Sequence, residues 1–526
     1  MTIVANGTVI DGTGTPAFCA DIVVEGDKVA DIVRRTAPSV PSQYPGADFI
    51  DAAGLLVTPG FIDSHSHSDA YIVIEPDAPS KVSQGITTEV DGQCGGSAAP
   101  RYGEARLSSD WASILGERLS WRSCAEYRAA VEAVRPAANR VMFAGHNTIR
   151  SSAMGYAARP ATEDAMRAME RMLEEAMDAG AHGLTTGLIY QPGRYASPEE
   201  VLRLARVVAA RGGIYATHIR SEGDRLLESI DEVSSLARAS GVRAIVSHFK
   251  TSGRANWHKL DAAVAAMEKG ITEGCFIGSD RYPYCAAGTD LDVVLPDWAQ
   301  EGAAAAECLR LADPTLRSRI AAEIDASGRD WNEVRIGGVW CPQNRPFCGK
   351  SVAAILKERS VAGRRDTAGS LVCEILADDK CRTGAFFFTM SEANLDRILS
   401  LPWVVPCSDA SLRSPQGPLG EDHPHPRAYG TMPEYWHRMR ALGFSREETV
   451  RRMTSLPARR YGLSRRGTLE KGAFADICCW SEERFSSPAT YTVPHAFAQG
   501  VECVMVNGAV PYFRGRFTGH RAGRFV

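Results

Sequence analysis

Two histidines that could share a metal ion lie close together near the start of the chain. His65 and His67 follow the apolar segment 57–63 and are separated only by Ser66. Because alternate residues of an extended chain point the same way, both imidazoles can reach one ion. Imidazole nitrogen is a good ligand for borderline metals such as zinc. Taken alone, the pair is explained equally well by a metal site and by two unrelated polar histidines.

Four further side chains of metal-ligand type each follow a segment predicted to be a strand. The segments and their donors are 86–90 with Cys94, 214–217 with His218, 244–247 with His248, and 403–408 with Asp409. In parallel α/β barrels, residues at the carboxyl ends of the strands carry the chemistry. One such histidine is more often an ordinary core or loop residue. Six donors in the same relative position predict a metal centre.

The middle of the chain has the alternation of elements that would bring those donors together. Apolar residues at helical spacing predict helices over 164–179, 198–210 and 226–239. Strand-like segments over 183–188, 214–217 and 244–247 alternate with them. Repeated β-then-α order indicates a parallel sheet, and its length favours an α/β fold with a (β/α)8 TIM-like barrel over residues 61–464.

Both ends of the chain differ from the middle in that they contain predicted short strands separated by turns. Strand-like segments lie at 3–10 and 20–29, and again at 472–480 and 501–510. Glu-Gly-Asp at 25–27 and Asn-Gly at 507–508 are hairpin signals. We expect residues 1–60 and 465–526 to form one small β-sandwich. The alternation of strand-like and helix-like segments is also lost at about 287–342, and we interpret this stretch as an inserted lid segment.

The composition excludes several classes of function. The chain has 526 residues, of which 44% are hydrophobic and 23% charged, and a formal net charge of −4. That charge disfavours nucleic acid or an anionic membrane as the main partner. No apolar run could span a bilayer, and the N-terminus does not resemble a signal peptide. The 14 cysteines show no CxxC pairs or disulfide-framework spacing, so we expect reduced thiols and a cytoplasmic location.

Short motifs spread over nearly the whole chain resemble those of the amidohydrolase superfamily, and specifically the N-acyl-D-amino-acid deacylases (D-aminoacylases). Examples are Thr-His-Ile-Arg-Ser-Glu at 217–222, Tyr-Pro-Tyr at 282–284 and His-Pro-Arg at 425–427. The remaining motifs are 59–67, 92–95, 187–193, 247–250, 408–409, 454–458 and 472–476. Any one of them is weak, whereas the set is specific. The resemblance implies hydrolysis of an N-acyl-D-amino acid to a D-amino acid and a carboxylate.

The resemblance also implies how the metal is held. Many binuclear relatives bridge two metals with a carboxylated lysine or a glutamate, and the matching strand at 183–187 offers neither. By resemblance, the Cys94 thiolate takes that position and forms a tight zinc site with His218 and His248. A weaker or empty second site then falls to the remaining donors, His65, His67 and Asp409. The alternative for Cys94 is a buried thiol in a glycine-rich turn.

Asp409 is our candidate for the general base, which later gives its proton to the leaving amine. Its alternative role is that of a metal ligand alone. Lys250, Tyr282 and Arg427 match family positions that hold the substrate carboxylate, a task for which Arg is well suited by its bidentate geometry. Tyr190 is our candidate for a residue that faces the carbonyl under attack, although an aromatic core position is the other interpretation.

Two other functions compete with this interpretation. A cyclic-amide hydrolase of the dihydropyrimidinase or hydantoinase type is disfavoured by Cys94, by the missing bridging lysine and by the Lys250/Arg427 pair. A non-catalytic scaffold is disfavoured because all six donors are present. Two segments depart from the family pattern: 410–426 is longer than expected, and 285–289 lacks the serine that we expect near Gly288. We expect a small-molecule N-acyl amino acid as the partner, and a monomer or small homo-oligomer; D-stereochemistry rests wholly on the resemblance.

Overall fold

A barrel of parallel strands forms the centre of the protein, seen in a computed structural model that describes residues 1–107 and 109–526. Two hydrogen-bonded runs make up the barrel, β6-β7-β8 and β9-β10-β11-β12-β13-β17. Their bounds are Phe61–Asp63 (β6), Ile86–Asp91 (β7), Asn139–Met142 (β8), Ala144–Gly145 (β9), Gly183–Gly187 (β10), Ile214–His218 (β11), Arg243–Val246 (β12), Ile277–Arg281 (β13) and Val404–Pro406 (β17). The runs join because only Phe143 separates β8 from β9, and because a parallel bridge pairs Ser66 with Ala410. The barrel expected from the β–α rhythm is confirmed.

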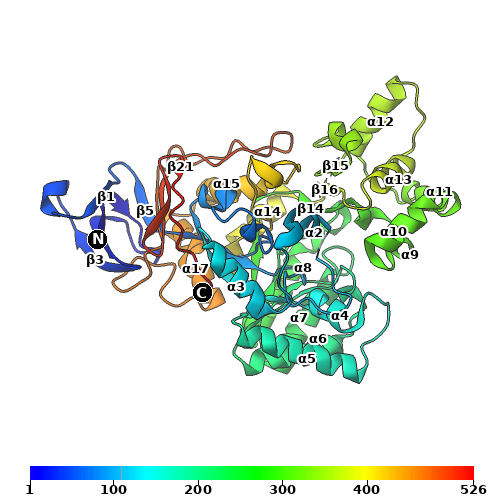
Figure 1. The fold of residues 1–526 in the computed structure, drawn as a ribbon, viewed down its shortest axis with the longest axis horizontal. Helices are drawn as coiled ribbons and strands as arrows, with labels where there is room; N and C mark the ends of the chain where they lie inside the picture. The colour runs from blue at the N-terminus through cyan, green and yellow to red at the C-terminus, as the bar shows by residue number, and fades with distance from the viewer. Residues whose placement is uncertain (108) are drawn as a thin grey trace.

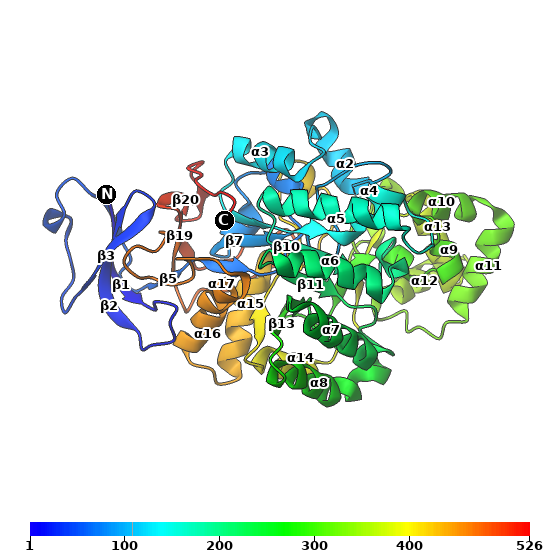
Figure 2. The same cartoon turned by 90° about the horizontal axis from the view of Figure 1, so that it is seen from below.

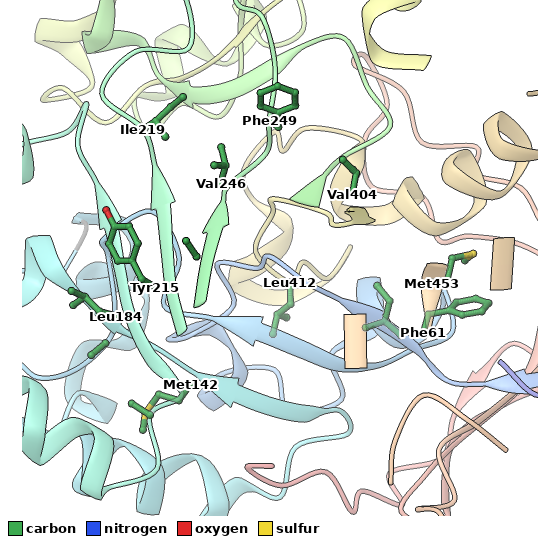
Figure 3. Close-up of a cluster of buried hydrophobic side chains, with 14 of the residues drawn as sticks. Phe61, Met142, Leu184, Tyr215, Ile219, Val246, Phe249, Val404, Leu412 and Met453 are labelled. Carbon is green, nitrogen blue, oxygen red and sulfur yellow. The ribbon is translucent and has the colours of Figure 1, made fainter. Parts of the chain in front are cut away.

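Helices pack around the barrel and bury one face against it. The predicted helices are present as α5 (Glu163–Asp178), α6 (Pro198–Ala210) and α7 (Leu226–Ser240). In α5 the buried residues Met166, Met169 and Leu173 recur at helical spacing, and each contributes roughly 1.5–3 kcal/mol by leaving water. Figure 3 shows the matching strand side chains Leu184, Tyr215 and Val246 on β10, β11 and β12. The hydrophobic layer therefore lies between strands and helices and leaves the barrel's end free for polar groups.

The other helices complete the shell and the connections. They are α1 (Pro79–Val82), α2 (Ser109–Leu115), α3 (Cys124–Val134), α4 (His146–Met154), α8 (Leu260–Thr272), α14 (Glu392–Ser400), α15 (Arg427–Ala441), α16 (Arg446–Met453) and α17 (Ser455–Tyr461). Across the described residues, no helix combines the length and the apolar character needed to cross a membrane.

Strands from the two ends of the chain form a separate sheet at one end of the molecule (Figure 1). They are β1 (Thr2–Val9), β2 (Phe18–Glu25), β3 (Lys28–Arg34), β4 (Asp48–Asp51), β5 (Leu56–Pro59), β18 (Ile477–Trp480), β19 (Val501–Val506), β20 (Ala509–Phe513) and β21 (Arg516–Phe517). Hydrogen bonds connect them into one nine-stranded sheet, in which β5 joins β1 to β18. Both hairpin signals are confirmed, since β2 pairs with β3 around Gly26 and β19 pairs with β20 around Asn507-Gly508.

An inserted unit lies at the opposite end from this sheet, beyond the barrel (Figure 2). A three-stranded antiparallel sheet runs through it in the order β14 (Ala287–Asp290), β16 (Gly384–Phe387), β15 (Val334–Ile336). Its helices are α9 (Asp297–Gln300), α10 (Ala303–Ala312), α11 (Pro314–Asp325), α12 (Val352–Val361) and α13 (Ala368–Asp378). The unit has its own hydrophobic core, which includes Leu311, Ile320 and Leu371. It continues past residue 342 because β16 returns to lie between β14 and β15.

Candidate metal centre

The six predicted donors meet at the carboxyl end of the barrel and form two overlapping groups. One group contains Cys94, His218 and His248; the other contains His65, His67, Cys94 and Asp409. Within each group the ligand atoms all lie within 4.8 Å of one another. Side chains from distant parts of the sequence therefore converge on a space of the size that a metal ion and its ligands need.

Cys94 lies at the centre of the cluster. Its Sγ is 3.3 Å from His248 Nε2, 3.7 Å from His218 Nδ1 and 3.4 Å from His65 Nε2. Burial raises the pKa of the Cys94 thiol. The charges of His65 and His248 and a hydrogen bond from His218 lower this pKa by more, so that it lies well below its usual value. This setting favours the thiolate form of Cys94. One thiolate with two imidazoles is a donor set that suits zinc.

Three of the donors have left-handed backbone conformations, which cost non-glycine residues energy. Their φ angles are 52° at Cys94, 37° at His248 and 49° at Asp409. Backbone hydrogen bonds hold two of them: the His248 N–H donates to Asp280 at 2.7 Å, and the Asp409 N–H donates to the His65 carbonyl at 2.9 Å. The chain is thus held in a strained shape at the positions where side chains must turn into the site.

Asp409 connects the second group. Its Oδ1 lies 3.1 Å from His67 Nε2 and 3.4 Å from His65 Nε2, and its Oδ2 lies 2.9 Å from Arg427 Nη1. Burial raises the pKa of Asp409, but Arg427 and the neighbouring histidines lower it to well below its usual range. The carboxylate is therefore ionised.

The imidazoles balance these negative charges. Burial lowers the pKa of His67, but hydrogen bonds to Asp409 and Cys94 raise it to about 9. The pKa of His65 also lies well above its usual value, because the charges of Asp280 and Cys94 outweigh its burial. A bound cation would take over this balancing role and release the protons.

Glu222 contacts one of the six donors and was not among the predicted site residues. Its Oε1 lies 2.9 Å from His248 Nδ1 and also contacts Lys250 Nζ. Burial raises the pKa of Glu222, but Lys250, His218 and His248 lower it below the usual value. For His248 to bind a metal through Nε2, its proton must be on Nδ1, and Glu222 is the acceptor for that proton. The motif at 217–222 contains Glu222 and could have pointed to it.

We predict that Glu222→Gln lowers zinc affinity by roughly 10- to 100-fold, the usual cost of losing a partner that orients a ligand. Glutamine keeps the shape but removes the charge that favours the Nδ1–H form of His248. Competition with a chelator measures the change, and Glu228→Gln on the exposed face of α7 is the matched control. An affinity equal to that of the unsubstituted protein would show that Glu222 does not orient His248.

Lys81 and Asp63 were also missed, and they join the two segments that carry the second group. Lys81 Nζ donates to Asp63 Oδ2 at 2.7 Å, to Ser408 Oγ at 2.8 Å and to the Ala410 carbonyl at 2.8 Å. Asp63 in turn accepts the Ser408 N–H at 2.7 Å. These buried bonds fix the segment before His65 against the segment before Asp409. No sequence signal marks Lys81, because its partners are up to 329 residues away.

The four predicted substrate-binding residues lie around the two groups. Lys250 Nζ is 2.7 Å from His248 Nδ1, and the ring of Tyr190 packs edge-on against His218 at 4.9 Å. The Arg427 guanidinium lies 4.5 Å from the centre of the Tyr282 ring. Among the described residues, the Tyr282 hydroxyl has no hydrogen-bond partner and remains free to donate. The arrangement places two cations and a phenol beside the donors.

The two segments that depart from the family pattern have different positions. Gly288 borders Arg427, whose Nη2 donates to the Gly288 carbonyl at 3.3 Å. A Cβ at Gly288 would lie 3.4 Å from the same nitrogen. In the longer segment, Arg413 pairs with Asp422 at 2.8 Å, and it lies over the ring of Tyr71.

Comparison with known proteins places this architecture in a family. A model of the amidohydrolase family matches residues 48–332 and 416–512. D-aminoacylase of Alcaligenes xylosoxydans xylosoxydans is 34% identical over 531 residues, which cover 100% of this chain and 97% of that protein. A crystal structure of D-aminoacylase has a TM-score of 0.81 at 32% identity and covers 100% of this chain and 99% of its own.

A second solved structure is that of N-acyl-D-glutamate deacylase from Bordetella bronchiseptica with zinc and a phosphonate inhibitor. Its TM-score is 0.82 at 31% identity, with 100% of this chain and 98% of that chain covered. The chain described here belongs to the amidohydrolase family, among the N-acyl-D-amino-acid deacylases, and is a hydrolase of linear amide bonds.

Proposed function

We propose that this protein is a zinc-dependent deacylase that hydrolyses N-acyl-D-amino acids to a D-amino acid and a carboxylate. The observation that carries the proposal is the Cys94 thiolate beside the His218 and His248 nitrogens, with Asp409 facing the same space. The matched relatives include D-aminoacylase and two deacylases of N-acyl-D-glutamate and N-acyl-D-aspartate. All three act on a D-amino acid that bears an N-acyl group.

Cys94, His218 and His248 would hold one zinc tightly, and His65, His67 and Asp409 would form a weaker second site. A thiolate among the ligands favours zinc over hard cations such as Mg²⁺. Support for unequal sites comes from a structure of D-aminoacylase described by one-metal activation and second-metal attenuation. The chemistry that bound zinc supplies is Lewis acidity, which polarises the amide carbonyl and makes water a stronger acid.

Asp409 is the proposed general base. Its ionised carboxylate accepts a proton from the attacking water and then delivers that proton to the nitrogen of the leaving amine. A carboxylate with a lowered pKa is a weak base towards ordinary water, and the Lewis acidity that bound zinc would supply would compensate for this weakness. The ion pair with Arg427 fixes the orientation of the carboxylate at 2.9 Å.

Lys250, Tyr282 and Arg427 would bind the carboxylate of the substrate. Lys250 and Arg427 are only 4% and 5% exposed, so their charges act in a poorly solvated setting where ion pairing is strong. Each already has one acidic partner, Glu222 and Asp409 respectively. Tyr282, whose ring centre lies 5.9 Å from Lys250 Nζ and 4.5 Å from the Arg427 guanidinium, adds a hydroxyl donor. Tyr190, packed on His218, would face the carbonyl that is attacked.

We predict that Arg427→Ala raises KM for N-acyl-D-amino acids by at least about 10-fold, because it removes a charge-assisted hydrogen bond to the carboxylate. KM for a neutral carboxamide analogue should change far less. An equal increase for both substrates would argue against a carboxylate clamp.

The same variant should also change the pH profile. Arg427 holds the pKa of Asp409 down, so without it the carboxylate becomes protonated at higher pH. The acid limb of kcat/KM should therefore move to higher pH.

A hydrolysis screen of paired N-acetyl-D- and N-acetyl-L-amino acids with the zinc-loaded protein tests the proposed function. We expect hydrolysis of D-substrates only, with no turnover of dihydrouracil, the cyclic-amide control. Activity confined to L-substrates would overturn the stereochemical assignment, and turnover of dihydrouracil alone would replace the deacylase with a cyclic-amide hydrolase.

A further inference from the structure

The connection between β18 and β19, residues 481–500, leaves the strand sheet and extends over α15 toward the inserted unit (Figure 1). We call this segment the strap. Near its middle, Tyr491 packs against the rings of Phe386 at 5.6 Å and Phe388 at 4.8 Å, both at the end of the inserted unit. On another side its ring lies 4.9 Å from that of His425. One strap residue thus contacts both the inserted unit and the loop that leads to Arg427.

His425 has hydrogen bonds that define where its proton lies. Its Nδ1 accepts the backbone N–H of Arg427 at 3.0 Å and therefore carries no proton. Its Nε2 is 3.1 Å from the Ala286 carbonyl and 3.1 Å from the Tyr491 phenol oxygen. Because neutral imidazole has one N–H, that proton is on Nε2 and is shared by these two oxygens. The neutral His425 ring therefore connects Tyr491 of the strap to the backbone of Arg427.

Arg427 begins helix α15, and the first N–H groups of a helix have no partner within it. The His425 side chain supplies the missing acceptor for the Arg427 N–H. The position of this backbone matters because the guanidinium has to face both Asp409 at 2.9 Å and the Gly288 carbonyl at 3.3 Å. A displacement of about 1 Å in a group that positions substrate is enough to lose much of its effect.

We propose that Tyr491 and His425 are positioning residues for Arg427, and that the strap thereby sets how tightly the enzyme holds the carboxylate of its substrate. This inference rests on the proposed function, in which Arg427 binds that carboxylate. It gives the strand sheet, whose own strands lie at the far end of the molecule, a part in substrate binding.

Other contacts of the strap hold its backbone without involving the Tyr491 hydroxyl. His423 Nε2 lies 2.7 Å from the Tyr491 carbonyl. His495 bonds the Asp422 carbonyl and the Tyr429 hydroxyl, each at 2.9 Å. Removing the hydroxyl alone therefore tests the link to His425 while the strap stays in place.

Steady-state kinetics of Tyr491→Phe on an N-acetyl-D-amino acid and on its carboxamide are the first test. Phenylalanine keeps the packing on Phe386 and Phe388 and loses only the hydroxyl. We expect KM for the carboxylate substrate to rise by roughly 2- to 10-fold, the range for one hydrogen bond, with kcat within about twofold. KM for the carboxamide should stay the same. Val493→Ala, 63% exposed on the same strap, is the matched control.

A pair of substitutions at His425 separates positioning from packing. Asparagine there can accept the N–H two residues ahead through its side-chain oxygen, as in an Asx turn, whereas alanine cannot. We expect His425→Ala to raise KM for the carboxylate substrate and His425→Asn to restore much of the loss. If ring packing were what mattered, both variants would be equally impaired.

The outcomes distinguish this inference from the proposed function. Wild-type hydrolysis of D-substrates with unchanged KM in Tyr491→Phe and His425→Ala would overturn the inference and leave the function. Equal increases of KM for carboxylate and carboxamide would also overturn it. A wild-type protein that hydrolyses no D-substrate would remove the proposed function, and the inference with it.

Discussion

Replacing Cys94 by serine should lower zinc affinity by at least about 100-fold, because loss of an orienting partner alone already costs 10- to 100-fold and here a ligand is lost. The physical reason is that the negatively charged sulfur of Cys94 binds zinc more strongly than a neutral donor would. Three imidazole nitrogens lie within 3.7 Å of Sγ and lower its pKa well below the usual value. A serine hydroxyl in the same place remains neutral, so the site loses its negative charge as well as its soft donor. Turnover at one equivalent of zinc should fall with the affinity.

Cys19→Ser is the matched control, since Cys19 is an exposed cysteine in the strand sheet, away from the donors. Zinc content by elemental analysis and turnover should be measured on the same samples. A Cys94→Ser protein that keeps one tightly bound zinc would show that Cys94 is only a buried thiol in its turn.

Asp409→Asn should reduce kcat by roughly 10²- to 10⁴-fold, the usual contribution of a general acid–base residue. Asparagine can still contact His67 and Arg427 but cannot take a proton from water. Because the proposed tight site consists of Cys94, His218 and His248 without Asp409, the variant should still bind one zinc. Loss of turnover with retained metal is therefore the expected combination.

The control for Asp409 is Asp231→Asn on the exposed face of helix α7, which changes charge away from the site. Near-normal kcat in Asp409→Asn would assign another group as the base. Loss of the tightly bound zinc together with activity would mean that Asp409 belongs to the tight site instead.

The barrel and the six donors could be predicted from sequence because each obeys a local rule. Helix α6 spans Pro198–Ala210, the range expected from its apolar spacing, and the structure shows Ser197 capping it before the proline at its first position. Each donor follows a parallel strand, and strand ends of a barrel meet on one face. Local rules and one topological rule were thus enough to place the six donors on one face, whereas the grouping of Cys94, His218 and His248 was implied by the family resemblance.

What could not be predicted depends on contacts between distant segments. Lys81 bonds Ser408 and Tyr491 bonds His425 across 327 and 66 residues, and neither contact leaves a periodic pattern. The sequence indicated the inserted unit only by an interruption of the β–α alternation, because β14, β15 and β16 are short antiparallel strands separated by helices. Glu222 lay within a recognised motif, but its role depends on which nitrogen of His248 faces Cys94, and that is a matter of three-dimensional geometry.

The most direct test of the account is a titration of metal-free protein with zinc while hydrolysis of an N-acetyl-D-amino acid is followed. We predict that turnover rises linearly and reaches its maximum at one equivalent of zinc, with the ion held by Cys94, His218 and His248. Full activity without metal, or activity that begins only with the second equivalent, would contradict the account.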